Sequence, residues 1–409
     1  MKAVVLAAGE GTRMRPLTAN LPKPLLPVAG KPFLRHSLEA LRAARIKELA
    51  ILIGWQGHRI RERFGDGAAL DLSIAYEEQG ERLGTAHAIG CMRAHVEGAF
   101  LSVNGDVVVS GQALSELLAF HGKVRGPVMA LAEVPDPSAF GVVEMKDEKV
   151  SSLEEKPRKP KSHLINAGIY VFDEGIFPLI DATPKSPRGE FEITDTIRLL
   201  MAKRDVYGFR LPTEWIDVGR PWDLLRANAA LLAPLKGATH GQVDPGATLV
   251  GEVLVEAGAT VRRGSYIEGP TIVGAEAEIG PNCYIRPATS IGPKAKVGNA
   301  CEVKNSILMA SPRAPSELRG RQHPRRAMQP RRGHEGGEPP TRRGAREGRV
   351  PRGRGRHRTA EAWRDHGGRR EGGHQRVDRR GYHRRGRVLP WPGGPRAGKH
   401  RAAEPDLLR

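Results

Sequence analysis

Two basic side chains near the N-terminus have surroundings typical of a phosphate-binding site. Arg13 follows a glycine-containing turn, Gly9–Thr12, which comes soon after the apolar segment Lys2–Leu6. Backbone N–H groups in such a turn are free to meet phosphate oxygens, and the guanidinium adds a fork of donors suited to the same oxygens. Lys23 comes ten residues after Arg13, and prolines on both sides stiffen the backbone that carries it. These residues indicate chemistry on a phosphorylated substrate.

Two familiar phosphate-binding motifs do not fit this turn. The dinucleotide motif G-x-G-x-x-G requires a third glycine where this chain has Met14, which weakens a dinucleotide interpretation. A P-loop requires Gly-Lys followed by Ser or Thr, and none follows here. Each residue also has a structural alternative, because a lysine between prolines is often only solvated and an aspartate after a strand is often a cap. The assignment therefore depends on the rest of the chain.

Short apolar segments alternate with segments of helical spacing over residues 1–230. The pattern predicts strands and helices at Lys2–Leu6 (strand), Phe33–Ala44 (helix), Leu49–Ile53 (strand), Leu72–Tyr76 (strand), Thr85–His95 (helix) and Ala99–Val103 (strand). Strands separated by helices predict an α/β, Rossmann-like fold with a mainly parallel sheet covered on both faces. Such sheets bind ligands at the carboxyl ends of their strands, and Gly9 and Asp106 both lie just past such ends.

Residues 243–308 follow a different rule, a strict six-residue period. An aliphatic residue stands at every sixth position from Val243 to Val303, with small residues filling much of the space between. A hexapeptide period predicts a parallel β-helix in which three hexapeptides make one triangular coil and each aliphatic side chain points into a narrow core. A β-sandwich would instead give period-two alternation. The register fails at Met309 and Pro315.

The net charge is concentrated in the last quarter of the chain. The whole sequence carries 65 Lys and Arg against 46 Asp and Glu, a formal net charge of +19. Residues 310–409 hold 28 of these basic residues and 10 of the acidic ones, which leaves 37 against 36 in residues 1–309. Composition therefore excludes a basic nucleic-acid-binding surface over the first three quarters of the chain.

Residues 310–409 have the composition of a disordered, Arg-rich tail. Val, Ile, Leu and Phe together number 7 there, too few to offset the entropy of ordering, and Arg outnumbers Lys 27 to 1. Lost register, lost aliphatic residues and reversed Lys/Arg usage coincide near Ala310. We interpret the tail as a frameshift product of a GC-rich gene, because its codons, read one base out of register, can encode further hexapeptide-like sequence. The alternative is a genuine arm that binds RNA or membranes, although Trp363, Tyr382 and Trp391 are its only aromatic residues.

The run from Leu6 to Pro32 resembles the signature of sugar-1-phosphate nucleotidylyltransferases. It is most similar to glucose-1-phosphate thymidylyltransferases and to bifunctional nucleotidylyltransferase/acetyltransferases that carry a left-handed β-helix. Further landmarks follow in the order of that family at Gln79, Leu83–Ala86, Asn104–Asp106, Phe140–Glu144, Glu154–Pro157, Asn166–Tyr170 and Trp215–Gly219.

This resemblance implies transfer of a nucleotidyl group from dTTP or UTP to a sugar-1-phosphate, with Mg²⁺ as cofactor and pyrophosphate as the second product. The attacking phosphate is already ionised, so no protein nucleophile or general base is needed. The resemblance also implies a role for each of several residues. They are Arg13, Lys23 and Lys156 (catalytic); Ala8, Gly9, Gly11, Thr12, Gln79, Gly84 and Thr85 (nucleotide); Gly141, Glu155 and Asn166 (sugar); and Asp106 and Asp217 (metal).

We expect four parts: a nucleotidyltransferase domain (1–230), a linker (231–242), a truncated left-handed β-helix (243–309) and the basic tail (310–409). The relatives' β-helices commonly form homotrimers, and one alternative is that this β-helix serves only oligomerisation. Another is that it acetylates an amino-sugar-1-phosphate. We expect acetyl transfer to be lost here, because the histidine implied by the resemblance falls in the shifted frame across Pro315 and Ser316. A third is that the first domain is a regulatory homologue without turnover.

The remaining chemistry-bearing residues show no ligand pattern. Cys91, Cys283 and Cys301 are far apart, which favours free thiols in a reducing cytoplasm. His36, His58, His87 and His95 lack metal-ligand spacing, and we interpret them as structural or exposed. We expect no membrane span, no signal peptide and no specific nucleic-acid partner.

Overall fold

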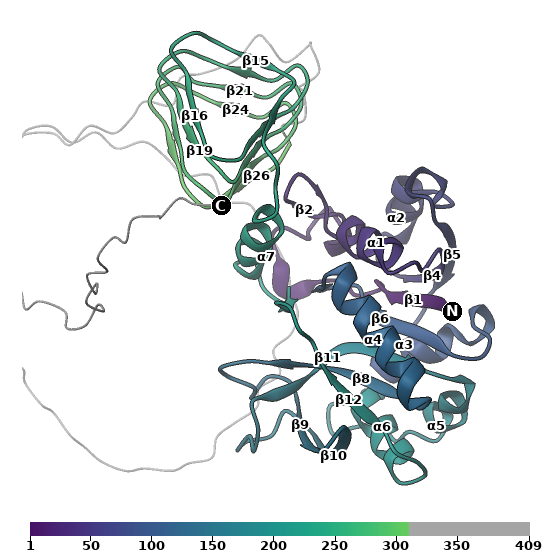
Figure 1. Ribbon diagram of the computed structural model, residues 1–409. Helices are drawn as coiled ribbons and strands as arrows, with labels where there is room; N and C mark the ends of the chain where they lie inside the picture. The colour runs from purple at the N-terminus through teal and green to yellow at the C-terminus, as the bar shows by residue number, and fades with distance from the viewer. Residues whose placement is uncertain (311–409) are drawn as a thin grey trace, which may run out of the picture. The chain divides into compact units, whose positions relative to one another are not determined.

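A computed structural model describes residues 1–310, so the expectations for a disordered tail and for its frameshift origin lie outside the described residues. Within residues 1–310, the first part of the chain forms a nine-stranded, mainly parallel sheet in the order β5-β4-β1-β6-β11-β8-β12-β10-β9 (Figure 1). Its strands are β1 (Lys2–Leu6), β4 (Glu48–Ile53), β5 (Ser73–Glu78), β6 (Phe100–Asn104), β8 (Val128–Glu133), β9 (Gly141–Lys146), β10 (Lys149–Glu155), β11 (Leu164–Phe172) and β12 (Tyr207–Arg210).

Helices cover both faces of this sheet, and short strands form two separate two-stranded sheets. The helices are α1 (Phe33–Ala43), α2 (Gly57–Phe64), α3 (Thr85–Cys91), α4 (Gly111–Val124), α5 (Phe177–Asp181), α6 (Ile193–Met201) and α7 (Asp223–Leu232). The short 3₁₀ turns are η1 (Thr12–Met14), η2 (Lys23–Leu25), η3 (Ala68–Leu70), η4 (Arg93–His95) and η5 (Glu174–Ile176). The small strands are β2 (Pro27–Val28), β3 (Lys31–Pro32), β7 (Val107–Val108) and β13 (Ile216–Asp217).

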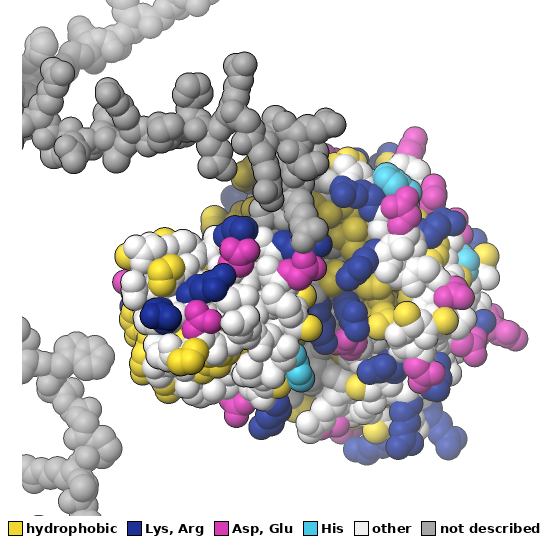
Figure 2. All heavy atoms as spheres, turned by 90° about the horizontal axis from the view of Figure 1, so that it is seen from above, with side chains coloured by type: hydrophobic (Ala, Val, Ile, Leu, Met, Phe, Trp, Pro, Cys, Tyr) yellow, Lys and Arg dark blue, Asp and Glu magenta, His cyan; other side chains and the backbone are white. Residues whose placement is uncertain are grey.

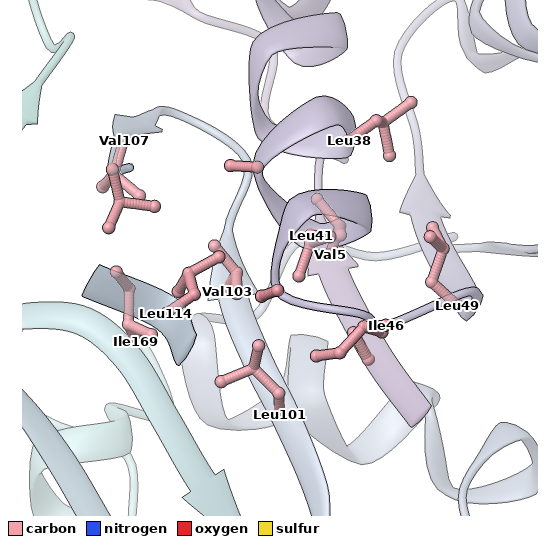
Figure 3. Close-up of a cluster of buried hydrophobic side chains, with 14 of the residues drawn as sticks. Val5, Leu38, Leu41, Ile46, Leu49, Leu101, Val103, Val107, Leu114 and Ile169 are labelled. Carbon is pink, nitrogen blue, oxygen red and sulfur yellow. The ribbon is translucent and has the colours of Figure 1, made fainter. Parts of the chain in front are cut away.

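Strand β1 shows why the sheet is buried on both sides. Its side chains alternate, so that Val5 packs into one core with α1 and α4, and Val4 packs into a second core with α3, α5 and α6. Figure 3 shows the first core, where Leu38 and Leu41 of α1 gather with Val5. Leucines at helical spacing give α1 one apolar face, as the sequence predicts.

One predicted helix is shorter than expected. The sequence predicts a helix over Thr85–His95, but α3 ends at Cys91 and a separate 3₁₀ turn spans Arg93–His95. The N–H of Met92 donates to the carbonyl of Ile89 at 3.0 Å, three residues back, so the last turn is a tighter 3₁₀ turn. The Met92 side chain is fully buried at this point.

The hexapeptide region forms three parallel sheets, whose sides are visible as stacked triangular coils in Figure 1. Most strands pair at 18-residue intervals, such as Thr260 with Glu278 and Glu278 with Lys296, which is the interval expected for three hexapeptides per coil. The strands are β14 (Ala238–Thr239), β15 (Gln242–Val243), β16 (Thr248–Val250), β17 (Val253–Val255), β18 (Thr260–Val261), β19 (Tyr266–Glu268), β20 (Thr271–Val273), β21 (Glu278–Ile279), β22 (Tyr284–Ile285), β23 (Thr289–Ile291), β24 (Lys296–Val297), β25 (Glu302–Val303) and β26 (Ile307–Leu308).

The periodic aliphatic side chains point inward as predicted. Val255, Val261, Ile267, Ile279 and Ile285 are fully buried in one core. The last coil differs from the strict period, because Leu308 pairs with Ile291 and Met309 is 37% exposed.

Helix α7 joins the two regions through one buried polar side chain. Asn228 is 0% exposed, and its Oδ1 accepts from the N–H of Ala29 at 2.8 Å and from Ser290 Oγ at 2.7 Å. Its Nδ2 donates to the carbonyl of Ala288 at 2.8 Å. The turn between β2 and β3 is thereby tied to the coil sheet that contains β23.

The described surface is consistent with the near-balanced charge of residues 1–309. Figure 2 shows basic and acidic side chains interspersed on one face. Within residues 1–310, no helix is both long and apolar enough to cross a bilayer.

Candidate functional site

A cavity of about 480 Å³ opens where the parallel strands β1, β4, β5 and β6 end. The loops that follow these strands meet at the same edge of the sheet, as expected for a parallel α/β fold. The end of β1 and the loop after β6 are in direct contact, because the N–H of Gly105 donates to the carbonyl of Leu6 at 2.9 Å. All seven residues predicted to contact the nucleotide line this cavity, namely Ala8, Gly9, Gly11, Thr12, Gln79, Gly84 and Thr85.

Two of the three predicted catalytic cations, Arg13 and Lys23, line the same cavity. The turn before Arg13 packs directly on Lys23, because Gly11 has a φ of +65° and a Cβ there would lie 3.2 Å from Lys23 Cβ. Thr18 fixes the turn by donating its hydroxyl to the carbonyl of Gly11 at 2.8 Å. Glycine at this position therefore brings the turn and the lysine into contact.

Lys23 and Asp106 form an ion pair at the floor of the cavity. Lys23 Nζ donates to Asp106 Oδ2 at 3.0 Å, although the two residues are 83 positions apart in sequence. Lys23 is only 9% exposed, so its charge is held in a fixed place. Asp106 is the more open partner, with its side chain 37% exposed. The ion pair therefore leaves an oxygen of the Asp106 carboxylate available to a ligand in the cavity.

Asp217 approaches from a different part of the chain. It lies on β13, which pairs antiparallel with β7 so that Asp217 faces Val107, the neighbour of Asp106. The pKa of Asp217 is raised to about 6, mainly by burial and also by the charge of Asp106, while Lys23 and Arg13 act in the opposite direction. Two carboxylates and two cations therefore share one small volume.

This arrangement suits a divalent cation. Two neighbouring carboxylates repel each other and raise each other's pKa, and a bound cation offsets this repulsion. Carboxylate oxygens are hard ligands, which suit a hard cation. Among residues 1–310, no group of three or more His, Cys, Asp and Glu side chains could hold a metal. Asp106 and Asp217 would therefore bind a cation together with oxygens of a bound phosphate and water, as is common for Mg²⁺.

A second cavity of about 230 Å³ adjoins the first. Predicted sugar or phosphate contacts Glu155, Lys156 and Asn166 line it, and so does Asp217. The two cavities share four lining residues, which are Thr85, Asn104, Asp106 and Glu190. Asp106 thus lies on the boundary between them.

Of the predicted residues Gly141 and Lys156, only Lys156 lines this cavity. Gly141 begins β9 in register with Glu155 of β10, and it is not among the residues that line the described cavity. Lys156 has a φ of +46°, a left-handed conformation that is unfavourable for a lysine. Its Nζ lies 3.4 Å from Glu155 Oε1. Such a backbone conformation is typical of residues whose position serves a function.

The structure adds residues that sequence reasoning missed. Arg188 lines the second cavity, where its guanidinium lies 2.6 Å from Glu192 Oε1 and 3.3 Å from Glu155 Oε1. Arg82 lines the first cavity and pairs with Glu10 at 3.1 Å. Both arginines stand in loops without a motif that carries a mechanism, so only the tertiary structure reveals them.

A glycine joins the walls of the two cavities. Gly84 has a φ of +116°, and a Cβ there would lie 2.5 Å from the carbonyl oxygen of Phe191. The N–H of Phe191 donates to the carbonyl of Leu83 at 2.7 Å, and the N–H of Ile193 donates to Thr85 Oγ1 at 3.0 Å. The loop that lines the first cavity is thereby fixed to the segment that lines the second.

Comparison with known proteins agrees with this geometry. The Nucleotidyl transferase family matches residues 2–233. The bifunctional protein GlmU of Methanocaldococcus jannaschii is 42% identical over 260 residues, which are 63% of this chain and 61% of that protein. A glucose-1-phosphate thymidylyltransferase of Streptomyces griseus is 40% identical over 265 residues, 64% of this chain and 75% of the relative.

A solved structure shares the fold. It is a Bacillus anthracis protein assigned to the glucose-1-phosphate thymidylyltransferases and crystallised with sucrose, and it superposes with a TM-score of 0.54 at 30% identity. The match covers 58% of this chain and 98% of that one. The predicted resemblance to sugar-1-phosphate nucleotidylyltransferases is thus confirmed, and the chain belongs to the nucleotidyl transferase family.

Proposed function

We propose that this chain transfers a nucleotidyl group from a nucleoside triphosphate, dTTP or UTP, to a sugar-1-phosphate and releases pyrophosphate. The observation that carries the proposal is the pair of adjoining cavities with Asp106 on their boundary. The first offers Arg13 and Lys23 to a triphosphate, and the second offers Lys156 and Arg188 to a sugar phosphate. Two anionic substrates can therefore meet at one point.

The reaction needs positioning and charge neutralisation more than proton transfer. A phosphate oxygen of the sugar-1-phosphate attacks the α-phosphorus, a new P–O bond forms, and the bond to the β-phosphate breaks with its electron pair leaving on pyrophosphate. Lys23 lies beside Asp106 and would reduce repulsion between the two phosphates as they approach. Arg13 would stabilise charge on the leaving pyrophosphate.

We propose Mg²⁺ as the cofactor, held by Asp106 and Asp217. Bound there, the ion would supply Lewis-acid stabilisation of the α-phosphate. The raised pKa of Asp217 supports the proposal, because burial and the neighbouring carboxylate leave it ready to exchange a proton for a metal. The nucleotide contacts proposed for Ala8, Gly9, Gly11, Thr12, Gln79, Gly84 and Thr85 and the sugar contacts proposed for Gly141, Glu155 and Asn166 rest on the resemblance.

We propose the same domain division as the sequence predicts. The nucleotidyltransferase domain occupies residues 1–230, and helix α7 ends at Leu232 near its boundary. A linker spans 231–242, although β14 already begins at Ala238. The hexapeptide coils at 243–309 are proposed to be a truncated left-handed β-helix that forms trimers in relatives and does not carry acetyl transfer here. The thiols of Cys91, Cys283 and Cys301 are free, which supports a cytoplasmic location.

Pyrophosphate release tests the proposed function. The full chain is incubated with Mg²⁺, a panel of sugar-1-phosphates and each of dTTP, UTP, CTP, ATP and GTP. We expect release only when both substrates are present, and none after chelation of the metal. Asp217→Asn should lose activity, whereas Asp71→Asn, an exposed aspartate outside both cavities, should not. Silence across the whole panel would defeat the enzyme assignment in favour of a regulatory homologue.

A further inference from the structure

The wall of the first cavity holds one buried polar side chain whose orientation is fixed from behind. Gln79 follows β5, lines the cavity and is 8% exposed. Its Nε2 lies 3.1 Å from Nδ1 of His87, the third residue of α3. From its sequence context we interpret His87 as structural or exposed, but this contact connects it to the proposed nucleotide site.

The chemistry of the two groups sets the direction of this hydrogen bond. An amide NH₂ can only donate, so Nδ1 of His87 accepts and the ring proton lies on Nε2. The ring nitrogens of His87 face Cys91 Sγ at 3.9 Å. Burial raises the pKa of the Cys91 thiol, and Glu77 raises it further, so that the sulfur remains a neutral, weak acceptor. This side of the imidazole does not compete for Gln79.

The oxygen of the Gln79 amide is left for a ligand. With Nε2 donated to His87, Oε1 has no partner among the described residues. In that part of the chain, the only buried side-chain atoms sealed from solvent without a partner belong to Ser37, Ser102 and Thr194. Gln79 Oε1 therefore opens onto the cavity, as an acceptor that cannot exchange places with its own NH₂.

We propose that His87 is a positioning residue for base selection, holding Gln79 so that Oε1 accepts from the ring N3–H of uracil or thymine. This inference rests on the proposed function, which places a pyrimidine triphosphate in the cavity. N3–H is the only donor on the ring edge of these two bases, whereas cytosine presents an acceptor at N3. With cytosine, two acceptors, N3 of the base and Oε1 of Gln79, would face each other without a proton between them, which a polar site rejects strongly.

A matched pair of substitutions separates the hydrogen bond from the shape of the side chain. Asn and Leu have the same branched shape, but only Asn places an acceptor where Nδ1 of the imidazole stands. His87→Asn should keep the amide orientation, and His87→Leu should release it. His95→Leu is the control, because His95 pairs with Glu77 at 2.9 Å and lines neither cavity.

The readout is the ratio of kcat/KM for UTP or dTTP to that for CTP, measured on the full chain, together with equilibrium binding of the same nucleotides. We expect the unmodified chain to favour UTP or dTTP by about 100-fold or more. His87→Leu should lower that ratio by about tenfold or more, while His87→Asn and His95→Leu stay within about threefold. His87→Ala serves the same purpose if His87→Leu does not fold.

Each other result overturns the inference. A ratio unchanged by His87→Leu or His87→Ala means that the histidine does not orient Gln79, and an equal fall with His87→Asn means that packing, not the acceptor, matters. A preference of the unmodified chain for CTP means that Oε1 meets an amino group instead. If the chain uses UTP or dTTP and the ratio does not respond, this inference fails alone. If it neither binds nor uses any triphosphate, the proposed function fails and the inference falls with it.

Discussion

At the scale of single residues, the site is a balance of opposite charges in a partly buried volume. Lys23 is held 3.0 Å from Asp106, and Arg13 and Lys23 both lower the pKa of Asp217 against the larger effect of burial. Removing one partner leaves the others uncompensated, which costs more than the pair itself contributes. The charges therefore act as a unit, and each is best tested against a similar residue outside the site.

Replacing Lys23 with methionine tests the central cation. Lys23→Met keeps the length of the side chain and removes its charge, so the approach of two anionic substrates loses its main compensation. We expect kcat/KM for pyrophosphate release to fall by about 10²–10³-fold, the loss typical of one transition-state charge contact. The control is Lys31→Met, since Lys31 pairs with Glu39 on the surface and lines neither cavity. A loss in the control as large as that in Lys23→Met would contradict the assignment.

At the scale of elements, helix α1 is joined to strand β2 by a histidine whose charge state matters. His36 Nε2 bonds the carbonyl of Val28 at 2.9 Å. Burial lowers the pKa of His36 below its ordinary value of 6.5, with Lys31 and Arg35 acting in the same direction and the Val28 carbonyl and Glu39 opposing. The native protein thus favours the neutral imidazole.

The sign of the pH effect follows from this shift. Below about pH 6.5 the unfolded chain takes up a proton on His36 that the folded chain resists, so the stability contribution present above that pH is lost as pH falls. His36→Gln keeps a donor at the ε position and does not titrate. We expect the unfolding free energy of the unmodified chain to decline relative to His36→Gln between about pH 7.5 and pH 5.5. A difference that stays constant over this range would contradict the prediction.

The junction between α7 and the hexapeptide coils gives a second prediction at this scale. Asn228→Ala leaves the N–H of Ala29, the hydroxyl of Ser290 and the carbonyl of Ala288 without their buried partner. We expect the free energy of unfolding to fall by about 2–4 kcal/mol, measured by denaturant titration. Asn299→Ala, on the exposed surface of the coils, should change it by less than about 0.5 kcal/mol. Equal effects would mean that the junction carries no special stability.

Periodic features of the sequence predict most of the fold. The apolar run Lys2–Leu6 is predicted as a strand and observed as β1, and the hexapeptide period predicts both the inward side chains and the 18-residue coil. Periodicity cannot predict features that depend on partners distant in the sequence. In the sequence, nothing distinguishes Asn228 from an ordinary helix residue, because its hydrogen bonds with Ala29 and Ser290 form only in the folded chain.

The candidate site has the same limit: its residues can be predicted from the sequence, but their contacts cannot. Motifs identify many of the residues around both cavities, including Asp106 and Asp217, which are 111 positions apart in the sequence. They cannot reveal that Arg188 faces Glu192 and Glu155 in the second cavity, because the contact depends on how the end of β10 packs beside the segment that leads into α6. The hydrogen bond between His87 and Gln79 likewise depends on the packing of α3 beside the end of β5.

At the scale of the whole molecule, the basic charge and the proposed chemistry belong to different parts of the chain. Residues 310–409 carry 28 of the 65 Lys and Arg, whereas the two cavities are lined by residues between Leu6 and Gly219. A chain that ends at Ala310 should therefore keep its kcat/KM within about twofold, a difference of about 0.4 kcal/mol. Retention on an immobilised polyanion should fall in the same variant. A large loss of turnover would show that the tail contributes to the reaction.

The most direct test of the central claim follows the phosphorus atoms. The full chain is supplied with Mg²⁺, its preferred sugar-1-phosphate and a pyrimidine triphosphate labelled separately at the α and γ positions. Nucleotidyl transfer predicts that the α label appears in a nucleotide sugar and the γ label in pyrophosphate. A γ label found on the sugar, or an α label that leaves only as the nucleoside monophosphate, would contradict the account.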